Sequence, residues 1–349
     1  MSINWSKVNR VLVVKLRSIG DTVLATPSLI ALRRFLPEAQ IDIVLEDWVA
    51  PILDGADFVD DVIIASGTLA SRAGVISELR RRHYDVAFNL HGGTTSTFFT
   101  AASGAKHRVG YDTYQYSFLY NHRLASASDF WKTEFTHSAE QQLALLGSAG
   151  VPVDDRPRSR LPITPEAMRS IELRLAESGL RDSQCQIALF HPTSAFFTKR
   201  WPIENYARVA EHLERNGMPV VAIGSAGESQ LLQDLSREST AKIIIFSDLR
   251  LPEITALASR SSLFIGNDSG IAHIAAAVNT PSVVIFGSSN RAHWRPWTDA
   301  PNEIVYHEFP CQPCAGYECK AFGRPRCILE ISVDEIIAAI ARLSAKRAS

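Results

Sequence analysis

One stretch of this chain, residues 262–287, constrains the fold more than any other. Its sequence, SLFIGNDSGIAHIAAAVNTPSVVIFG, starts with a short apolar run, Leu263–Ile265, that predicts a buried strand. The run breaks at a polar turn between two glycines, and Ile271–Val278 then shows a helical pattern before a second apolar run. Because glycine permits a tight turn and the first N–H groups of a helix are free, such a unit can hold a phosphate or diphosphate.

The same arrangement occurs near the N-terminus. An apolar run predicts a strand, the sequence RSIGD forms a turn, and Thr22–Phe35 has a helical pattern that contains Pro27. Either the helix begins at Asp21 and kinks, or Thr26 caps it and Pro27 takes the first helical position. A glycine at a strand–helix junction also has an ordinary structural explanation. Two such turns, one in each half, favour a site built between two nucleotide-type domains.

Apolar runs alternate with helical patterns through both halves of the chain, which predicts βαβ units and parallel sheets. The expected strands are Val11–Val14, Ile41–Leu45, Val62–Ile64, Val86–Leu90, Ile187–Phe190, Val220–Ile223, Ile243–Phe246, Leu263–Ile265 and Val283–Phe286. The expected helices are Thr22–Phe35, Leu69–Arg82, Pro202–Arg215, Glu228–Glu238, Pro252–Ser259, Ile271–Val278 and a closing helix Val333–Leu343. Residues 92–145 show only partial periodicity.

Length and composition indicate a two-domain protein of 349 residues. The proline-rich, charged segment 151–165 reads as a linker. We therefore expect an N-terminal domain over residues 1–165, linker included, and a C-terminal domain over residues 166–349. The net charge of −1 lacks the basic excess of a nucleic-acid binder. With no apolar run near the roughly 18 residues of a membrane span and no signal-peptide pattern, we expect a cytoplasmic protein.

Three segments carry a further pattern: VLVVKLRSIGDTVLATPSLIALRRFLP at 11–37, HPTSAFFTKRWPIENYARVA at 191–210 and FIGNDSGIAHIAAAVNTPSVVIFG at 264–287. In order and spacing they resemble glycosyltransferase family 9, the ADP-heptose:lipopolysaccharide heptosyltransferases, across nearly the whole chain. The resemblance implies an α/β fold of the GT-B type, two Rossmann-like domains facing across a cleft. The N-terminal domain would bind the acceptor, and the C-terminal domain would bind the nucleotide-sugar donor.

The resemblance also implies an activity. It would be an inverting, metal-independent transfer of a heptose from ADP-L-glycero-β-D-manno-heptose to the lipopolysaccharide inner core. The place would be the cytoplasmic face of the inner membrane, with peripheral membrane contact. A family 9 transferase with another donor sugar or acceptor, and a nucleotide-binding module without transfer, remain alternatives. A dinucleotide-dependent oxidoreductase would need a Gly-x-Gly-x-x-Gly turn, and neither half has one.

Asp21 and Lys199 are the expected catalytic residues. By resemblance, Asp21 is the base that takes the proton from the acceptor hydroxyl, whereas its residue type alone favours a helix N-cap. Lys199, by resemblance, contacts the donor phosphates. An ammonium there would stabilise the departing diphosphate without a metal, and a solvated lysine is the structural alternative.

The other donor contacts are expected in the second half of the chain. Thr193 and Ser194 could add donors to the phosphates, although both residue types are common in turns. By resemblance, the amides of Ser269 and Gly270 hold the diphosphate and Asp268 meets sugar hydroxyls.

Glu228 and His273 complete the expected donor site. Glu228 follows a predicted strand end, where a carboxylate can accept from ribose hydroxyls, but it also suits a helix N-terminus. His273 is expected as a donor contact or as a brace for Asp268, with a packed structural histidine as the alternative.

Acceptor contacts are expected from basic and polar residues of the first domain. The candidates are Arg17, Ser18, Asn89, His91 and Arg108. Lipopolysaccharide core acceptors are acidic and phosphorylated, which suits arginine.

Four of the five cysteines cluster as Cys311-x2-Cys314-x4-Cys319-x7-Cys327. This spacing could close a tetrahedral four-thiolate site for a structural zinc ion. In a cytoplasmic protein a metal site is more plausible than two disulfides. Structural zinc, free thiols and disulfides all stay open here, and no catalytic cofactor is expected.

Overall fold

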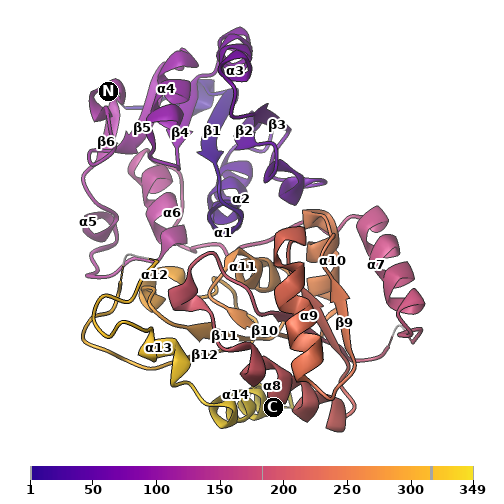
Figure 1. Cartoon of the computed structure of the whole chain (residues 1–349). Helices are drawn as coiled ribbons and strands as arrows, with labels where there is room; N and C mark the ends of the chain where they lie inside the picture. The colour runs from indigo at the N-terminus through magenta and orange to yellow at the C-terminus, as the bar shows by residue number, and fades with distance from the viewer. Residues whose placement is uncertain (1, 183, 315–316, 349) are drawn as a thin grey trace. The chain divides into compact units, whose positions relative to one another are not determined.

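In the computed structural model, the chain divides into two compact units, Met1–Pro162 and Ile163–Ser349 (Figure 1). The structure describes residues 2–182, 184–314 and 317–348. The division between the units falls inside the proline-rich segment 151–165.

The first unit is built on a parallel six-stranded sheet in the order β3-β2-β1-β4-β5-β6. Its strands are β1 (Arg10–Leu16), β2 (Gln40–Glu46), β3 (Asp61–Ala65), β4 (Val86–Asn89), β5 (His107–Tyr111) and β6 (His122–Leu124). This is the strand order of a dinucleotide-binding domain, in which the direction of winding reverses between β1 and β4. The central strands are buried along nearly their whole length, as strands covered on both faces must be.

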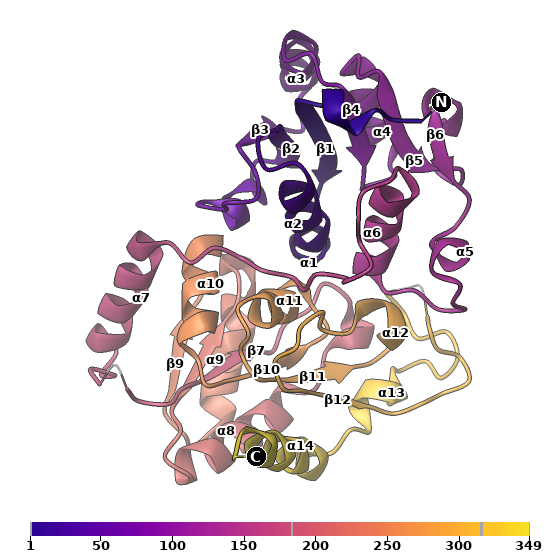
Figure 2. The same ribbon diagram turned by 180° about the vertical axis from the view of Figure 1, so that it is seen from behind.

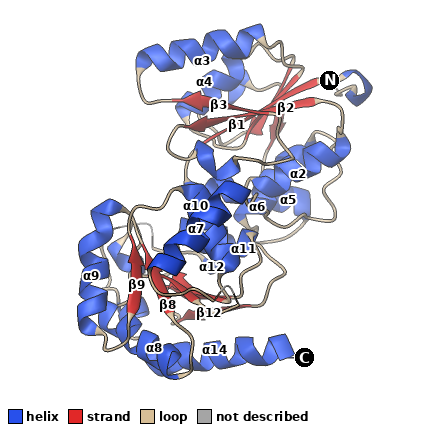
Figure 3. Cartoon of the chain, turned by 90° about the vertical axis from the view of Figure 1, so that its right-hand side faces the viewer, coloured by secondary structure: helices blue, strands red, loops and turns tan. Residues whose placement is uncertain are grey.

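Helices cover both faces of this sheet. They are α1 (Ile19–Val23), α2 (Thr26–Phe35), α3 (Leu69–Arg81), α4 (Thr94–Ala102), α5 (Ala127–Trp131) and α6 (Ser138–Ser148). Figure 3 shows α3 and α4 on one face and α2 and α6 on the other. The strands and helices expected before residue 90 are confirmed, apart from the start of the first helix.

That first helix, expected over Thr22–Phe35, is broken into α1 and α2. Ala25 is the N-cap of α2 and Pro27 is its second residue, so both expected starts were wrong. A continuous helix would clash with the Pro27 ring and lose one hydrogen bond. At the break, the Thr26 hydroxyl donates to a carbonyl of α1 at 2.7 Å. The break leaves α1 as a short helix with Asp21 in its first turn.

The second unit repeats the architecture with a parallel sheet in the order β12-β11-β10-β7-β8-β9. Its strands are β7 (Ala188–His191), β8 (Val220–Ile223), β9 (Ile243–Phe246), β10 (Leu263–Asn267), β11 (Ser282–Phe286) and β12 (Asn302–Tyr306). Counted from its own first strand, this is again the dinucleotide-binding order, and the reversal lies between β7 and β10.

The helices of the second unit also form two layers. They are α7 (Pro165–Glu177), α8 (Ile203–Arg215), α9 (Ser229–Glu238), α10 (Leu251–Arg260), α11 (Gly270–Ala277), α12 (Arg291–Trp294), α13 (Arg326–Leu329) and α14 (Val333–Ala348). In Figure 2, α8 and α14 pack together on one face of the sheet, and α10 and α11 pack together on the other. The core is made of aliphatic and aromatic side chains of the strands and these helices.

Several parts of the described structure were not expected. Segment 92–145 forms α4, β5, β6, α5 and α6, and its two strands have only five and three residues, which leaves little periodicity to detect. Helices α7, α12 and α13 and the edge strand β12 were also missed. Among the described residues, every helix is too short or too polar to cross a membrane.

Candidate active site

In each unit, polar residues gather where the strand order reverses. Parallel strands end at the same edge of a sheet, and ligands of open α/β sheets bind outside that edge at the reversal. In the first unit, Asp21 follows β1 and His91 follows β4. In the second unit, Thr193 follows β7 and Asp268 follows β10. Each unit therefore offers one candidate binding site.

Asp21 lies in the first turn of α1, and its side chain is 34% exposed. The hydroxyl of Ser18 donates to Asp21 Oδ2 at 2.9 Å, and Nζ of Lys15 lies 3.5 Å from Oδ1. Ser18 and not Asp21 occupies the N-cap position, so the structural alternative of a helix cap was wrong. The carboxylate is oriented by two neighbours and still reaches solvent, which is the geometry that a general base needs.

Lys15 is a site residue that the sequence analysis missed. Its side chain is 5% exposed, and it donates to the carbonyl of Leu90 at 2.9 Å. Burial lowers the pKa of Lys15, and the carboxylate of Asp21 opposes this effect. The position of this lysine inside the apolar run VLVVKL could have indicated its role, because lysine is almost never fully buried without a partner.

His91 lies beside this group at the end of β4. Burial lowers the pKa of His91, and the charges of Lys15 and Arg17 lower it further, while Asp21 opposes them. The imidazole is therefore neutral near pH 7.

Asn89 was expected to contact the acceptor, but in the structure its side chain is buried and bonded within the first unit. It is fully buried, and its Oδ1 accepts from the backbone N–H groups of His91 and Gly92 at 2.9 and 3.0 Å. Its Nδ2 donates to the Tyr120 hydroxyl at 2.6 Å. Asn89 shapes the turn that carries His91, because a buried amide must satisfy its hydrogen bonds inside the protein.

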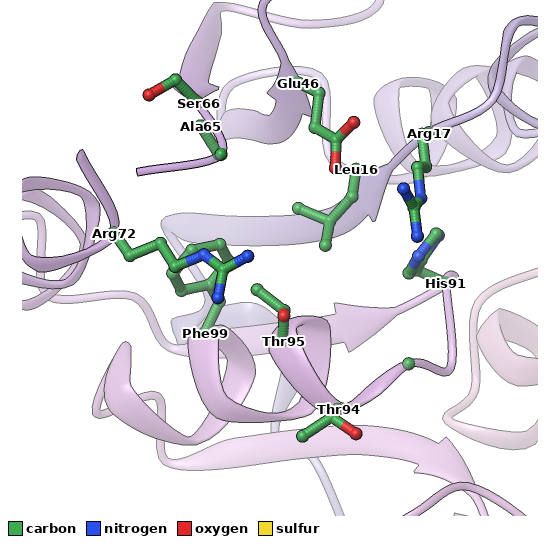
Figure 4. A pocket seen from close by; sticks show the side chains of 12 residues that line it. Leu16, Arg17, Glu46, Ala65, Ser66, Arg72, His91, Thr94, Thr95 and Phe99 are labelled. Carbon is green, nitrogen blue, oxygen red and sulfur yellow. The ribbon is translucent and has the colours of Figure 1, made fainter. Parts of the chain in front are cut away.

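A cavity of about 170 Å³ lies at this edge of the first sheet. Figure 4 shows the guanidinium groups of Arg17 and Arg72 reaching it from opposite sides, Arg17 beside His91 and Arg72 beside Thr95. Neither guanidinium forms an ion pair within the described part of the chain, whereas the Glu46 carboxylate accepts from the indole N–H of Trp48 at 2.8 Å. Two such guanidinium groups suit an anionic ligand group, a phosphate or a carboxylate. The lining residues are Leu16, Arg17, Glu46, Ala65, Ser66, Gly67, Arg72, His91, Gly93, Thr94, Thr95 and Phe99.

The other expected acceptor residues lie elsewhere. The Ser18 hydroxyl donates to the Asp21 carboxylate. Arg108 is the second residue of β5 and so lies near the opposite edge of the sheet, where its guanidinium donates to the carbonyls of Leu119 and Ala105 at 2.8 and 2.7 Å. The expected position at the end of a strand was wrong, because this segment starts β5. Arg72, which lines the cavity, was not predicted because it lies within helix α3.

In the second unit, Lys199 and Asp268 form a buried ion pair. Nζ lies 2.7 Å from Oδ2, and the side chains are 18% and 5% exposed. The Ser289 hydroxyl donates to the same carboxylate oxygen at 2.5 Å. Lys199 ends the 3-10 helix η4 (Phe197–Lys199), and its ammonium lies 5.4 Å from the centre of the Phe196 ring. The alternative of a solvated lysine was therefore wrong.

His191, the last residue of β7, connects the two turns of this unit. Its Nε2 lies 3.0 Å from the Thr193 hydroxyl, and its Nδ1 lies 3.1 Å from the Ser269 hydroxyl. Burial lowers the pKa of His191 to about 4, and the Glu228 carboxylate opposes this effect. A neutral imidazole thus holds both hydroxyls at the reversal point. His191 was not among the residues predicted from the sequence.

The remaining predicted donor residues lie in the turns after β7 and β8 or on helix α11. Thr193 and Ser194 are buried, and the Ser194 carbonyl accepts from Nε of Arg200 at 2.6 Å. Gly270 opens helix α11 after Ser269, whose side chain makes no cap hydrogen bond. His273 is buried on the same helix, and this fits the structural alternative of a packed histidine.

Glu228 occupies a helix-capping position at the end of the 3-10 helix η5 (Ala226–Glu228). Its Oε2 accepts from the N–H and the hydroxyl of Ser225 at 2.8 and 2.7 Å. Burial acts to raise the pKa of Glu228, but hydrogen bonds from Ser225 and Thr193 outweigh it and lower the pKa. These hydrogen bonds are those of a helix cap, so the position of Glu228 agrees with the structural alternative and does not require a ribose contact.

All four cysteines of the 311–327 segment line one small cavity. Each is a free thiol, so the structure contains no disulfide between them. Within the described ranges, no three His, Cys, Asp or Glu side chains have the arrangement of a formed metal site.

The profile of glycosyltransferase family 9 (heptosyltransferase) matches residues 72–323. Lipopolysaccharide heptosyltransferase 3 of Escherichia coli K12 is 28% identical over 303 residues, which cover 81% of this chain and 84% of that protein. Lipopolysaccharide heptosyltransferase 2 of Salmonella typhimurium is 26% identical over 281 residues, with 76% and 78% covered.

Solved structures show the same fold. A family 9 glycosyl transferase from Veillonella parvula has a TM-score of 0.83 at 21% identity, with 97% of each chain covered. ADP-heptose lipopolysaccharide heptosyltransferase II of E. coli has a TM-score of 0.80 at 21% identity, with 97% of this chain and 100% of that chain covered. The prediction of an α/β fold of the GT-B class is confirmed.

Proposed function

This chain belongs to glycosyltransferase family 9, and from that membership we propose that it transfers a heptose from ADP-L-glycero-β-D-manno-heptose to the lipopolysaccharide inner core. The names of its curated relatives support this substrate class. The observation that carries the proposal is the Asp21 carboxylate, oriented by Ser18 and Lys15 at the β1–β4 reversal. Beside it, a cavity lined by Arg17 and Arg72 suits an anionic acceptor.

In the proposed reaction, Asp21 takes the proton from the acceptor hydroxyl while that oxygen bonds to the anomeric carbon of the heptose. The bond from the anomeric carbon to the diphosphate oxygen breaks, ADP leaves, and the configuration inverts. Ser18 and Lys15 keep the carboxylate oxygens in place, so that little reorganisation is needed when the proton moves.

The donor is held by the second unit in this proposal. Lys199, anchored on Asp268, offers its remaining N–H donors to the diphosphate, and this positive charge supports departure of ADP without a catalytic metal. The first-turn amides of α11, at Ser269 and Gly270, add further donors. Asp268 accepts from the sugar hydroxyls.

The side chains of Thr193 and Ser194 complete the phosphate contacts in this scheme, while Glu228 accepts from the ribose and His273 supports Asp268 from α11. The reaction takes place at the cytoplasmic face of the inner membrane, where a soluble nucleotide sugar meets a lipid-linked acceptor. Arg17, His91 and Arg72 bind the anionic part of that acceptor.

A transfer assay tests the proposal. Purified protein is incubated with ADP-heptose and inner-core acceptors that carry none, one or two heptoses, and mass spectrometry follows the gain of one heptosyl residue. UDP- and GDP-sugars serve as competing donors. Use of another nucleotide sugar would replace ADP-heptose as the donor. ADP binding without any transfer would favour a nucleotide-binding module.

A further inference from the structure

The segment between β12 and α13 is a long loop that lacks helix and strand in its described residues, 307–314 and 317–325. Loops of this length without regular structure are uncommon inside compact domains. Gln312 Nε2 donates to the carbonyl of Gly287 at 2.6 Å, and the Cys314 N–H donates to the carbonyl of Ser288 at 2.8 Å. Further along the loop, the Tyr317 ring lies 4.6 Å from the Phe196 ring and the Phe322 ring lies 5.5 Å from the Phe309 ring, centre to centre.

The thiols of this loop converge on one place. Cys311, Cys314, Cys319 and Cys327 line a single cavity whose other walls include Phe309, Phe322 and Pro325. Thiols brought together in an apolar cavity keep their protons unless a cation replaces them, because thiolates there would repel one another.

We propose that these four cysteines bind one divalent metal ion, zinc or ferrous iron, in a tetrahedral thiolate site that holds the loop. The Cys311-x2-Cys314 turn supplies two ligands, and Cys319 and Cys327 supply the others. The four thiols release their protons as the metal binds, and rotation of the cysteine side chains toward the cavity closes the site.

The surroundings match the charge of such a site. Four thiolates and a divalent cation carry a net charge of −2, which needs a nearby positive group. Arg326 lines the same cavity, and its guanidinium lies 5.5 and 5.2 Å from the ring centres of Phe309 and Phe322. Its Nε also pairs with the Glu330 carboxylate at 2.5 Å, so its positive charge is shared between Glu330 and the proposed site.

The loop is connected to the Lys199–Asp268 pair through the end of β11. The Ser288 hydroxyl lies 2.8 Å from the Thr198 hydroxyl, next to Lys199, and the Ser289 hydroxyl donates to Asp268. At Gly287 the packing is so close that an added side-chain carbon would lie 2.3 Å from the carbonyl of Thr198. The four cysteines are therefore positioning residues: the metal holds residues 287–289, and these residues hold the ion pair.

Metal analysis is the first test. Wild-type protein purified under reducing conditions without chelator should carry about one zinc or iron per chain by elemental analysis. After reconstitution with Co²⁺, it should show the thiolate charge-transfer and strong visible bands of a tetrahedral sulfur site. Cys319→Ser should lose the metal and raise the KM for the donor while the KM for the acceptor stays constant. Cys185→Ser, in the same unit but outside the loop, is the matched control and should change neither.

Thiol titration of the wild-type protein keeps the proposal testable if Cys319→Ser does not fold. In the metal-loaded protein the loop thiols should resist modification, and chelator should make them reactive. Wild-type protein with only trace metal, no uptake of Co²⁺ and immediately reactive loop thiols would overturn the proposal. Full metal content in folded Cys319→Ser would do the same. An unchanged donor KM in a metal-free variant would overturn the link to the ion pair.

Discussion

Replacing Lys199 by methionine removes the ammonium that neutralises Asp268 and keeps most of the aliphatic stem. The Asp268 side chain is only 5% exposed, and its Oδ2 would retain the Ser289 hydroxyl as a hydrogen-bond donor. Removal of one partner of a buried ion pair costs about 3–5 kcal/mol, because it leaves a buried charge uncompensated. Lys199 itself is 18% exposed, so we expect the lower end of this range, about 3 kcal/mol.

For a domain of this size, each kcal/mol lowers the melting temperature by about 2–4 °C, so Lys199→Met should lower it by about 6–12 °C. The double variant Lys199→Met/Asp268→Asn removes both charges, and most of the lost stability should return. Its activity should not return, because the departing diphosphate has lost its positive partner. Loss of one such group reduces kcat by about 10²–10³-fold.

Differential scanning fluorimetry and steady-state kinetics measure these effects. Arg169→Met is the matched control, since Arg169 and Glu166 form a pair in the same unit at 3.3 Å with both side chains 73% exposed. An exposed pair of this kind is worth about 0–1 kcal/mol. Equal melting temperatures for Lys199→Met and Arg169→Met would refute the argument from burial. A double variant no more stable than Lys199→Met would also refute it.

Three further outcomes are expected. Asp21→Asn should reduce kcat by about 10²–10⁴-fold with ADP affinity unchanged by calorimetry, and an active variant would exclude Asp21 as the base. Arg72→Met should raise the KM for the acceptor only, and Arg81→Met, at the exposed end of α3, should change neither KM; a raised donor KM in Arg72→Met would contradict its role. Stability in urea should fall as the pH drops from about 6.5 to about 4, because the unfolded chain protonates His191 in this window whereas burial keeps the folded pKa near 4. His191→Asn should flatten this pH dependence, and an unchanged slope of stability against pH would exclude His191 as its source.

Some of the candidate site was predictable because local sequence patterns position it. The turn after β1 carries Asp21, and the turn after β10 carries Asp268, and both follow apolar runs that become buried strands. Once such a run is followed by a helix, its carboxyl end and the polar residues after it are known within a few positions. The GT-B resemblance added the expected roles, which still require the experiments above.

Other parts of the site depend on contacts between distant segments. Arg72 reaches its cavity from the first turn of helix α3, and Lys15 and His191 are oriented by partners that the local sequence does not reveal. Arg108 was misplaced because a short strand, β5, begins at a position where the sequence pattern suggested that one ended. The isolated lysine of a turn, Lys199, became a buried partner only through Asp268, 69 positions away.

The sequence by itself determined the alternation of strands and helices, the two glycine-containing turns and the grouping of four cysteines, because each is encoded within a few neighbouring residues. Only the tertiary structure decided which carboxylate is a cap and which is oriented for chemistry. It also decided which arginines face a cavity and which hold a loop. The physical reason is that hydrogen bonds, ion pairs and burial are set by the order of strands in each sheet, which brings together residues that are distant in the chain.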